Sequence, residues 1–455
     1  MSVIGQLIRR PKLDRGFLGE EPSGHDSTQR LTRLILDNLV QNRTLKNLNV
    51  RLWDGSMWPD ENPRVATLVL NRPGALREML LPGTETGIGE AYLDLAFDVE
   101  GNIEAAFELA DHLMEQTNGW TKKLGLGYLL RQLPERPFPN DRCKHQARLS
   151  GDRHSMKRDC EAISFHYNVS NDFYALWLDK TMAYSCAYFH QPTDNLKTAQ
   201  ENKFDYICRK LGLRSGDRLL DIGCGWGGLI LHAAGHYGVQ AEGITLSQQQ
   251  WEYTQERIKQ EGLADRVSVH LQDYRELSEE RIYDAIASVG MVEHVGQERL
   301  STYFGKVMRL LKPGGLFLNH GISLGPVVMP GETGSFIRDH VFPDSELTRI
   351  GDMLRFAEDE GWEIRDVESL REHYALTLRH WVHRLEANHD EAISLVDEST
   401  YRIWRLYMAG CAHNFQTGRL SIYQTLLAKI TKEGVSLAPV IRSKWYASTR
   451  VCSSP

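Results

Sequence analysis

The chain has no apolar run that approaches the roughly 20 residues of a membrane-spanning helix. Its first residues also lack the apolar core of a signal peptide. The 7 cysteines are scattered and form no CxxC pair, which disfavours a disulfide framework and a zinc site. These absences predict a cytoplasmic protein with reduced thiols and no bound metal.

An excess of positive charge is also absent, because the formal net charge is -7. Proteins that bind nucleic acid gain much of their affinity by neutralising phosphates with clustered Lys and Arg, so no nucleic-acid partner is expected. An anionic membrane would likewise repel the protein on average. Membrane docking would need a local basic patch, and the sequence offers two: Arg9, Arg10, Lys12 and Arg15, and the run 142–158. Most such charge runs are solvated faces, which is the alternative for both.

The 455 residues are too many for one compact core, and a content of 41% hydrophobic and 25% charged residues is typical of a globular protein. Residues 1–125 mix an alternating segment at 65–70 with a helical pattern at 102–114, which predicts a small α+β domain. Residues 126–160, with three prolines followed by many charges, are expected to form a linker.

The remaining residues, 161–455, carry short apolar runs that alternate with helical segments. The runs lie at 218–222, 239–244, 267–271, 285–289 and 315–318. This rhythm predicts a catalytic α/β domain built on a parallel sheet.

The most specific turn in this domain is LLDIGCGWGG at 219–228, which ends a buried strand and opens a helix. Open α/β sheets bind nucleotides at this place, because glycines let a ligand approach bare backbone. A glycine-rich turn alone is a weak signal and could serve packing only. Here Asp221 precedes the glycine-rich part, GCGWGG at 223–228, and the next strand ends in GITLS at 243–247. This combination resembles class I methyltransferases and implies a Rossmann-like domain with a mostly parallel seven-stranded sheet.

A dinucleotide-binding dehydrogenase is the main alternative for this turn. It would place an acidic residue at the end of the second strand, about 20 residues later, and Glu242 lies near that position. The adjacent pair Gly227 and Gly228 departs from the dinucleotide pattern and favours the methyltransferase.

Four further motifs occur in one order along the chain: MAYSCAY at 182–188, SVGMVEHVG at 288–296, NHGI at 319–322 and VFP at 341–343. Together they resemble cyclopropane-fatty-acyl-phospholipid synthases over about 160–430. The N-terminal region is similar, more loosely, to the lipid-binding domain of that family at 48–55 and 89–92. The resemblance implies transfer of a one-carbon unit to the cis double bond of an unsaturated phospholipid, on the inner face of the membrane. A homodimer is compatible with it.

The resemblances also imply which residues contact S-adenosylmethionine. The glycine turn would contact its amino acid part, together with the pair after Ala183, while the residues after the second strand would approach the ribose and those after the third the adenine. Cys224 is expected to pack, with only its backbone facing the cofactor. The implied set is Tyr184, Ser185, Asp221, Gly223, Cys224, Gly225, Trp226, Gly227, Gly228, Thr245, Leu246, Ser247, Gln250, Gln272 and Asp273.

The chemistry of such a reaction needs a base. An alkene is a weak nucleophile that must be held in line with the methyl group away from water. The resulting carbocation closes to a ring only if the new methyl group loses a proton. The resemblance implies a bound bicarbonate ion as the base, held by Cys186, Glu293, His320, the backbone of Ile322, and Tyr374. His320 and Tyr374 can donate hydrogen bonds, and Glu293 can take a proton or fix the orientation of the anion. Taken singly, a Glu is usually solvated, and a His or Tyr is more often a packed group of the core.

Cys411, in YMAGCA at 407–412, matches a position that descriptions of the family mark as active. Methyl transfer to an alkene requires no covalent enzyme intermediate, so a lining residue of the acyl channel or a buried structural thiol is the alternative.

Aromatic faces could stabilise the cation, and the candidates are Tyr167, Phe173, Tyr174 and Tyr303. A second set of apolar residues suits either an acyl channel or the core face of a helix: Phe336, Ile337, Val341, Phe342 and Leu347.

The sequence departs from the family pattern in two places, Val292 before Glu293 and Arg379-His380 after the Tyr374 motif. A displaced base would let the cation form a methyl- or methylene-branched product instead. Two rival functions stay open: a methyltransferase of soluble small molecules, and a noncatalytic lipid-binding protein that has kept the fold.

Overall fold

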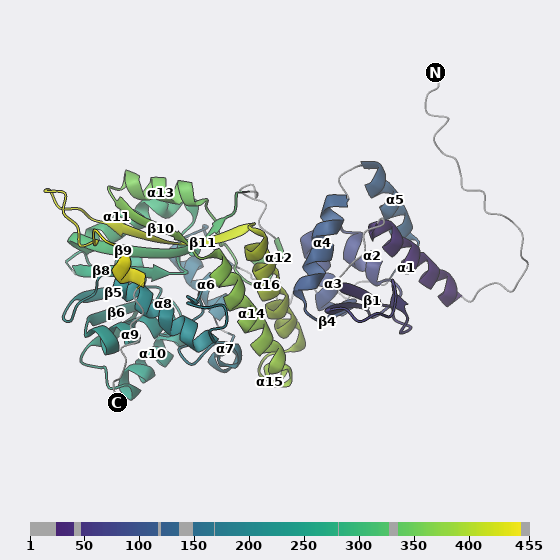
Figure 1. Cartoon of the computed structure of the whole chain (residues 1–455), viewed down its shortest axis with the longest axis horizontal. Helices are drawn as coiled ribbons and strands as arrows, with labels where there is room; N and C mark the ends of the chain where they lie inside the picture. Colours follow the sequence, from purple (N-terminus) through teal and green to yellow (C-terminus); the bar gives the residue numbers. More distant parts are fainter. Residues whose placement is uncertain are drawn as a thin grey trace, which may run out of the picture.

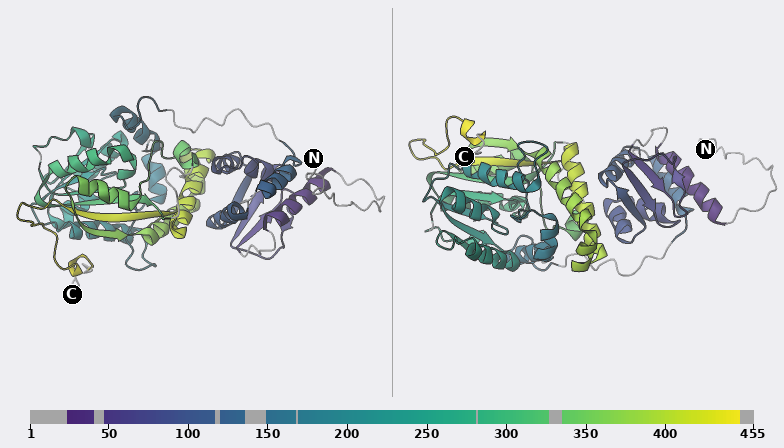
Figure 2. Two further views of the ribbon diagram at one scale, coloured as in Figure 1. Left: turned by 90° about the horizontal axis from the view of Figure 1, so that it is seen from above. Right: turned by 60° about the horizontal axis from the view of Figure 1, so that its bottom comes forward.

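The computed structural model describes residues 24–40, 47–116, 120–135, 149–167, 169–280, 282–326 and 335–446. They form a smaller N-terminal unit and a larger C-terminal unit, which lie side by side (Figures 1 and 2). The first basic patch, Arg9 to Arg15, lies outside the described residues, as do residues 142–148 of the second.

The N-terminal unit is a four-stranded sheet with helices packed on it, in the strand order β2-β1-β3-β4. Strands β1 and β3 are parallel, and the other pairs are antiparallel. Its strands are β1 (Leu48–Arg51), β2 (Met57–Trp58), β3 (Ala66–Leu70) and β4 (Phe97–Gly101). Its helices are α1 (Gly24–Val40), α2 (Ala75–Leu80), α3 (Glu85–Leu93), α4 (Glu104–Gln116) and α5 (Trp120–Arg131).

The expected linker, 126–160, contains the end of α5 and the beginning of α6 (Met156–Tyr167). The assignment of 1–125, 126–160 and 161–455 to two domains and a linker stays a prediction. No helix within the described ranges has the length and apolarity needed to cross a bilayer.

The C-terminal unit has a seven-stranded sheet in the order β10-β11-β9-β8-β5-β6-β7, in which only β11 runs antiparallel to its neighbours. The predicted mostly parallel Rossmann-like sheet is therefore confirmed. Its strands are β5 (Arg218–Ile222), β6 (Gln240–Thr245), β7 (Val267–Leu271), β8 (Tyr283–Val289), β9 (Leu311–Leu324), β10 (Glu363–Ser369) and β11 (Leu420–Ala428).

Helices cover both faces of this sheet, because its strands are apolar on both sides. One face is covered by α8 (Leu196–Lys210), α9 (Gly228–Tyr237) and α10 (Gln248–Gln260). The other is covered by α11 (Leu300–Leu310) and α13 (Ile350–Asp359). The shorter elements are the helices α7 (Asn171–Trp177), α12 (Ser335–His340), α15 (His389–Leu395) and α17 (Ser443–Tyr446), and the 3₁₀ turns η1 (Tyr274–Glu276), η2 (Val292–His294) and η3 (Gln297–Arg299).

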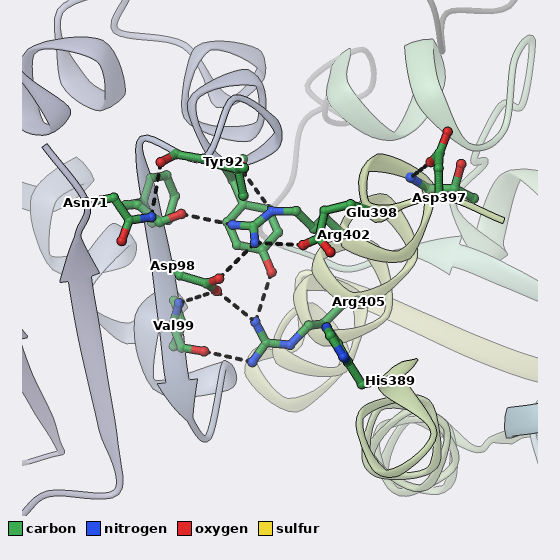
Figure 3. A network of polar contacts seen from close by, with 12 residues as sticks. Asn71, Tyr92, Asp98, Val99, His389, Asp397, Glu398, Arg402 and Arg405 are labelled. Carbon is green, nitrogen blue, oxygen red and sulfur yellow. Dashed lines mark hydrogen bonds and ion pairs between the residues drawn. The ribbon is translucent and has the colours of Figure 1, made fainter. Parts of the chain in front are cut away.

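Two long helices, α14 (Arg371–Ala387) and α16 (Glu398–Thr417), stand between the large sheet and the N-terminal unit (Figures 1 and 2). Two buried arginines of α16 reach across the junction (Figure 3). Arg402 donates to the carbonyl oxygens of Tyr92 and Phe97, each at 2.9 Å, and pairs with Asp98 at 2.8 Å. Arg405 donates to the Tyr92 hydroxyl at 2.9 Å. The two units are therefore joined by buried, charge-assisted hydrogen bonds.

Candidate active site

A cavity opens where β5, β6, β7 and β8 end, at the carboxyl edge of the parallel strands. It is lined by every residue expected to contact the cofactor except Gly227 and Ser247. Those two shape the site from behind. Gly227 precedes α9 in a left-handed conformation, and the Ser247 side chain caps α10 by accepting the Gln250 N–H at 3.3 Å.

The first wall of the cavity is the glycine turn. Gly223, Gly225 and Gly227 have φ angles of +80°, +56° and +83°, which residues other than glycine rarely adopt. A Cβ atom at Gly227 would also lie 2.6 Å from Cγ2 of Thr254. Where Gly223 and Gly225 line the cavity, the backbone is therefore bare. Cys224 packs against β6, since a Cβ atom at Gly243 would lie 2.8 Å from its Sγ.

Two opposite charges lie at the floor of the cavity. Asp221, at the end of β5, is buried, and its Oδ1 has no hydrogen-bond partner in the described chain. Burial raises the pKa of Asp221 to about 7, against the effect of the Lys203 charge. Lys203, from α8, donates to the Ser185 hydroxyl at 2.8 Å. Burial lowers the pKa of Lys203 to about 8. Sequence reasoning missed Lys203, because nothing in its motif distinguishes it from a solvated lysine.

The opposite end of the cavity carries Gln272 and Asp273, as the strand order implies. The Asp273 carboxylate is bound by the guanidinium of Arg275 at 2.6 and 2.8 Å. Arg275 also pairs with Asp159 of α6 at 2.9 Å, so α6 is tied to this edge of the sheet. Arg275 and Asp159 line the cavity too and were not predicted.

A second polar cluster lies where η2 meets β9. The backbone N–H of Ile322 donates to Oε1 of Glu293 at 2.6 Å, while Oε2 of Glu293 is buried and has no partner among the described residues. Burial raises the pKa of Glu293 to about 7, although the Ile322 hydrogen bond opposes the shift. A substantial fraction of Glu293 is therefore protonated near neutral pH.

His320 lies in the same strand as Ile322, and its side chain is buried. Burial lowers the pKa of His320 to about 3, so the ring is neutral. Nδ1 of His320 lies 3.5 Å from Nε2 of Gln424 on β11, and its Nε2 is buried without a described partner. If the Gln424 amide donates to Nδ1, then Nε2 carries the proton and can donate. Gln424 was not among the predicted residues, because β11 gave no sequence signal.

Cys186 and Tyr374 meet at the beginning of α14. The Cys186 Sγ lies 3.8 Å from the Leu370 carbonyl oxygen, which also accepts the Tyr374 N–H at 3.0 Å. Burial raises the pKa of the Cys186 thiol well above its ordinary range. Direct contacts thus join Glu293 to Ile322 and Cys186 to the Tyr374 turn; the two groups come from different elements of one buried region.

An aromatic cluster adjoins Tyr184. Its ring centroid lies 5.2 Å from Trp381, 5.4 Å from Trp177 and 5.7 Å from Tyr174. Of the residues considered for cation stabilisation, Phe173 and Tyr174 belong to this cluster. Tyr303 packs elsewhere, in the core beneath α11, and donates to Asn319 at 3.2 Å. The side chain of Tyr167 lies outside the described part of the structure.

Two of the channel candidates lie in different surroundings. The Phe342 ring stacks on His166 with centroids 4.0 Å apart. Phe336 lies against α3 of the N-terminal unit, where a Cβ atom at Gly89 would be 2.3 Å from its ring. Cys411 lies buried in α16, where burial raises the pKa of its thiol to about 12.

The sequence of residues 154–425 matches the mycolic acid cyclopropane synthetase family. The chain belongs to this family.

Relatives of known name extend the match over both units of the chain. The chain is 41% identical to a "Probable fatty acid methyltransferase" of Pseudomonas putida, over 88% of this chain and 96% of that protein. It is 33% identical to the "Cyclopropane-fatty-acyl-phospholipid synthase" of Escherichia coli strain K12, over 82% of this chain and 90% of the relative. The crystal structure of the mycolic acid cyclopropane synthase CmaA1 with SAH and CTAB is similar, with a TM-score of 0.56 and 33% identity over 59% of this chain and 98% of that one.

Membership of the cyclopropane synthetase family makes the protein an S-adenosylmethionine-dependent methyltransferase and removes the dehydrogenase alternative. The cavity fits this cofactor. Its glycine turn offers bare backbone, and the unpartnered Oδ1 of Asp221 and the ammonium of Lys203 provide charges of both signs, as a zwitterionic amino acid requires.

A testable feature of the site is the close packing of Gly321 on η2. A Cβ atom at Gly321 would lie 2.3 Å from Cγ1 of Val292 and 3.8 Å from Oε1 of Glu293. We expect Gly321→Ala to displace η2 and to lower methyl transfer from S-adenosylmethionine about 10-fold or more, since small misplacements of reacting groups are costly. Adding Val292→Ala removes the obstructing methyl group and should restore most of the activity. Steady-state assays of both variants check this, and a double variant as impaired as the single one would contradict it.

Proposed function

We propose that the protein transfers a one-carbon unit from S-adenosylmethionine to the cis double bond of an unsaturated phospholipid acyl chain and closes a cyclopropane ring. The observation that carries the proposal is a pair of buried atoms, Oε2 of Glu293 and Nε2 of His320, that have no hydrogen-bond partner within the described ranges. Buried polar atoms in native proteins are normally hydrogen-bonded, so two of them in one region favour a bound polar ligand. The names of relatives, which include a cyclopropane synthase of phospholipids, agree with it.

We propose that this ligand is bicarbonate, held by Cys186, Glu293, His320, Ile322 and Tyr374. Neutral His320 can donate from Nε2, and protonated Glu293 can donate from Oε2. The N–H of Ile322 is already used by Glu293, so its part would be to fix that carboxyl group. Bicarbonate bound there would supply the proton acceptor that ring closure needs.

The residues around the cavity would position the alkene and exclude water. S-adenosylmethionine supplies an electrophilic methyl group when bound. Tyr184 and Trp381 belong to the aromatic cluster, which offers the faces of electron-rich rings to a cation on the acyl chain. Because this cluster is packed and apolar, it also limits the water that would trap the cation.

A direct assay decides among the products. Purified protein would be incubated with S-adenosylmethionine and liposomes of cis-monounsaturated phospholipid, with and without bicarbonate, and the fatty acids analysed by mass spectrometry. A bicarbonate-dependent cyclopropane product is expected. A methyl- or methylene-branched product would keep the lipid and cation but remove the proposed base, in line with the fatty acid methyltransferase named among the relatives. Absence of any lipid product would favour a small-molecule methyltransferase or a noncatalytic lipid-binding protein.

We further propose peripheral contact with the inner face of the membrane, for which the second basic patch is a weak candidate. Within its described part, Arg158 pairs with Asp344 at 2.5 Å and Arg153 with Glu346 at 2.7 Å. Their charges are thus largely balanced. The first patch, Arg9 to Arg15, carries the proposal, and raising the salt concentration should weaken sedimentation with anionic liposomes. A homodimer also belongs to this proposal, and light scattering would test it.

The cysteines give a separate prediction about mechanism. Of the five that the structure describes, only Cys160 is exposed, whereas Cys186, Cys208, Cys224 and Cys411 are buried. Burial raises the pKa of Cys411 to about 12, which disfavours a thiolate at neutral pH. We therefore expect iodoacetamide at pH 7.5 to label Cys160 at least about 10-fold faster than Cys411, as peptide mass spectrometry would show. Equal labelling rates would revive a nucleophilic role for Cys411.

A further inference from the structure

Lys203 differs from the other buried lysines of the described chain in having no carboxylate partner. Lys210 pairs with Glu368 at 2.6 Å and with Asp366 at 3.1 Å. Lys306 lies 3.5 Å from Glu279 and donates to the Leu277 carbonyl at 2.6 Å. Lys203 is only 1% exposed, yet within the described residues it forms no ion pair. A buried, unpaired charge is costly, so its retention needs a reason.

The surroundings of the Lys203 ammonium point into the cofactor cavity. It donates to Oγ of Ser185 at 2.8 Å and lies 4.5 Å from the centre of the Phe204 ring. Both of these residues line the cavity, as do Lys203 itself and Asp221. Since the lysine donates to the serine oxygen, the Ser185 hydroxyl hydrogen is free to point towards a ligand. The cavity floor therefore presents a cation and a hydroxyl donor from one side and an aspartate from the other.

We propose that Lys203 binds the carboxylate of the amino acid part of S-adenosylmethionine. That part is the one section of the cofactor with a carboxylate, and the tight glycine turn brings it to this end of the cavity, opposite Gln272 and Asp273. A ligand carboxylate offsets the desolvation of the ammonium, which no described side chain does. Asp221 is left to face the positively charged amino group. Lys203 is thus a cofactor-binding residue that selects ligands with an intact amino acid.

The competing role for Lys203 is electrostatic support of the proposed bicarbonate site. Its charge acts on Cys186 and on His320, which both belong to that site. The two roles differ in the ligand that should respond. Carboxylate binding predicts an effect on S-adenosylhomocysteine in the absence of bicarbonate, whereas support of the second site predicts none.

The experiment compares S-adenosylhomocysteine with 5′-methylthioadenosine, which keeps the adenosine and the sulfur but has no amino acid. Isothermal titration calorimetry without bicarbonate would be carried out on the wild type, Lys203→Met and Lys197→Met. Lys197 is a matched control, because it lies on the same helix but its side chain is 58% exposed and pairs with Glu201. We expect Lys203→Met to weaken S-adenosylhomocysteine about 10- to 100-fold and 5′-methylthioadenosine less than about 3-fold. Lys197→Met should change neither.

Equal weakening of both ligands by Lys203→Met, or no weakening, would overturn the assignment. If this variant does not fold, Lys203→Gln with the same two ligands makes the same comparison, since Gln keeps polarity but not charge. The inference rests on the cofactor assignment and not on the lipid product. A wild type that binds neither ligand would remove the cofactor assignment, whereas normal wild-type binding with an unaffected lysine variant would remove only the role of Lys203.

Discussion

Glu293→Gln is expected to lower lipid methylation by at least about 100-fold and yet to make the protein more stable than the wild type above pH 7. The activity should fall because Gln cannot accept or give up a proton at the position of Oε2. The stability should rise because the wild-type carboxyl group pays for its ionisation in a buried site. One substitution therefore separates the proposed catalytic role of Glu293 from the cost of its burial.

The pH dependence follows from the direction of the shift. Burial raises the pKa of Glu293 from 4.5 to about 7, so folding disfavours the charged form. Below pH 4.5 the group is neutral in both the folded and the unfolded chain, and the penalty is absent. It grows as the pH rises through this interval and is complete above pH 7, where it reaches about 3 kcal/mol. Gln is neutral throughout and can still accept the Ile322 N–H through its amide oxygen.

Urea unfolding of both proteins from pH 5 to pH 8 measures the effect. The stability advantage of Glu293→Gln should be small at pH 5 and largest at pH 8. The control is Glu252→Gln on α10, whose carboxylate is exposed and accepts a hydrogen bond from Gln248 at 2.7 Å. This variant should show no such trend. A Glu293→Gln protein that is no more stable than the wild type at pH 8 would mean that Glu293 is ionised at little cost, against its burial.

Sequence patterns predicted the parallel half of the large sheet well. The run at 218–222 coincides with β5, since a strand buried on both faces reads as a continuous apolar segment. The run at 267–271 coincides with β7 at the edge of the sheet, where buried Val267 and Val269 alternate with exposed Ser268. They did not predict β10 or β11. β10 contains EIRDVES, whose charged residues conceal a strand at the edge of the sheet, and β11 pairs with β9 across about 100 residues of sequence. Only the folded chain shows that Gln424 lies opposite His320.

The site was predictable where motifs encode backbone and was not where function depends on burial. The positive φ angles of the turn require glycine, so the turn is visible in the sequence as a run of glycines. Lys203, in contrast, is one of several lysines on α8, and its burial depends on packing of that helix against the 182–188 segment. The same limit applies to Tyr303, which was considered for the cation but packs in a different core. Residue type suggests a role, while the environment decides it.

The junction between the two units gives the second large expected effect, for Arg402→Met. Arg402 has a side chain only 3% exposed and lies 3.8 Å from the centre of the Tyr92 ring. Met keeps much of the volume but removes the charge, so the carbonyl oxygens of Tyr92 and Phe97 lose a donor and the Asp98 carboxylate loses the nearer of its two arginines. Because removing the charged donor from a buried hydrogen-bond network is costly, we expect a loss of about 2–4 kcal/mol in the free energy of unfolding.

Arg379→Met is the matched control in the same interface. Arg379 of α14 pairs with Glu104 of α4 at 2.8 Å, but its side chain is 38% exposed, so solvent screens the pair. Its loss should cost less than about 1 kcal/mol. The affinity for S-adenosylhomocysteine should stay within about 2-fold of the wild type in both variants, since neither arginine lines the cavity.

Activity on liposomes tests whether the junction affects catalysis as well as stability. The helix that carries Arg402 also carries Trp404, which packs on the aromatic cluster around Tyr184. A shift of α16 would therefore move the aromatic cluster that is proposed to surround the acyl chain. Arg402→Met should then lower the rate of lipid methylation about 10-fold or more. Loss of stability with unchanged lipid turnover would show that the junction only holds the two units together. Loss of both, with normal cofactor affinity, would show that the N-terminal unit acts on the acyl site through α16.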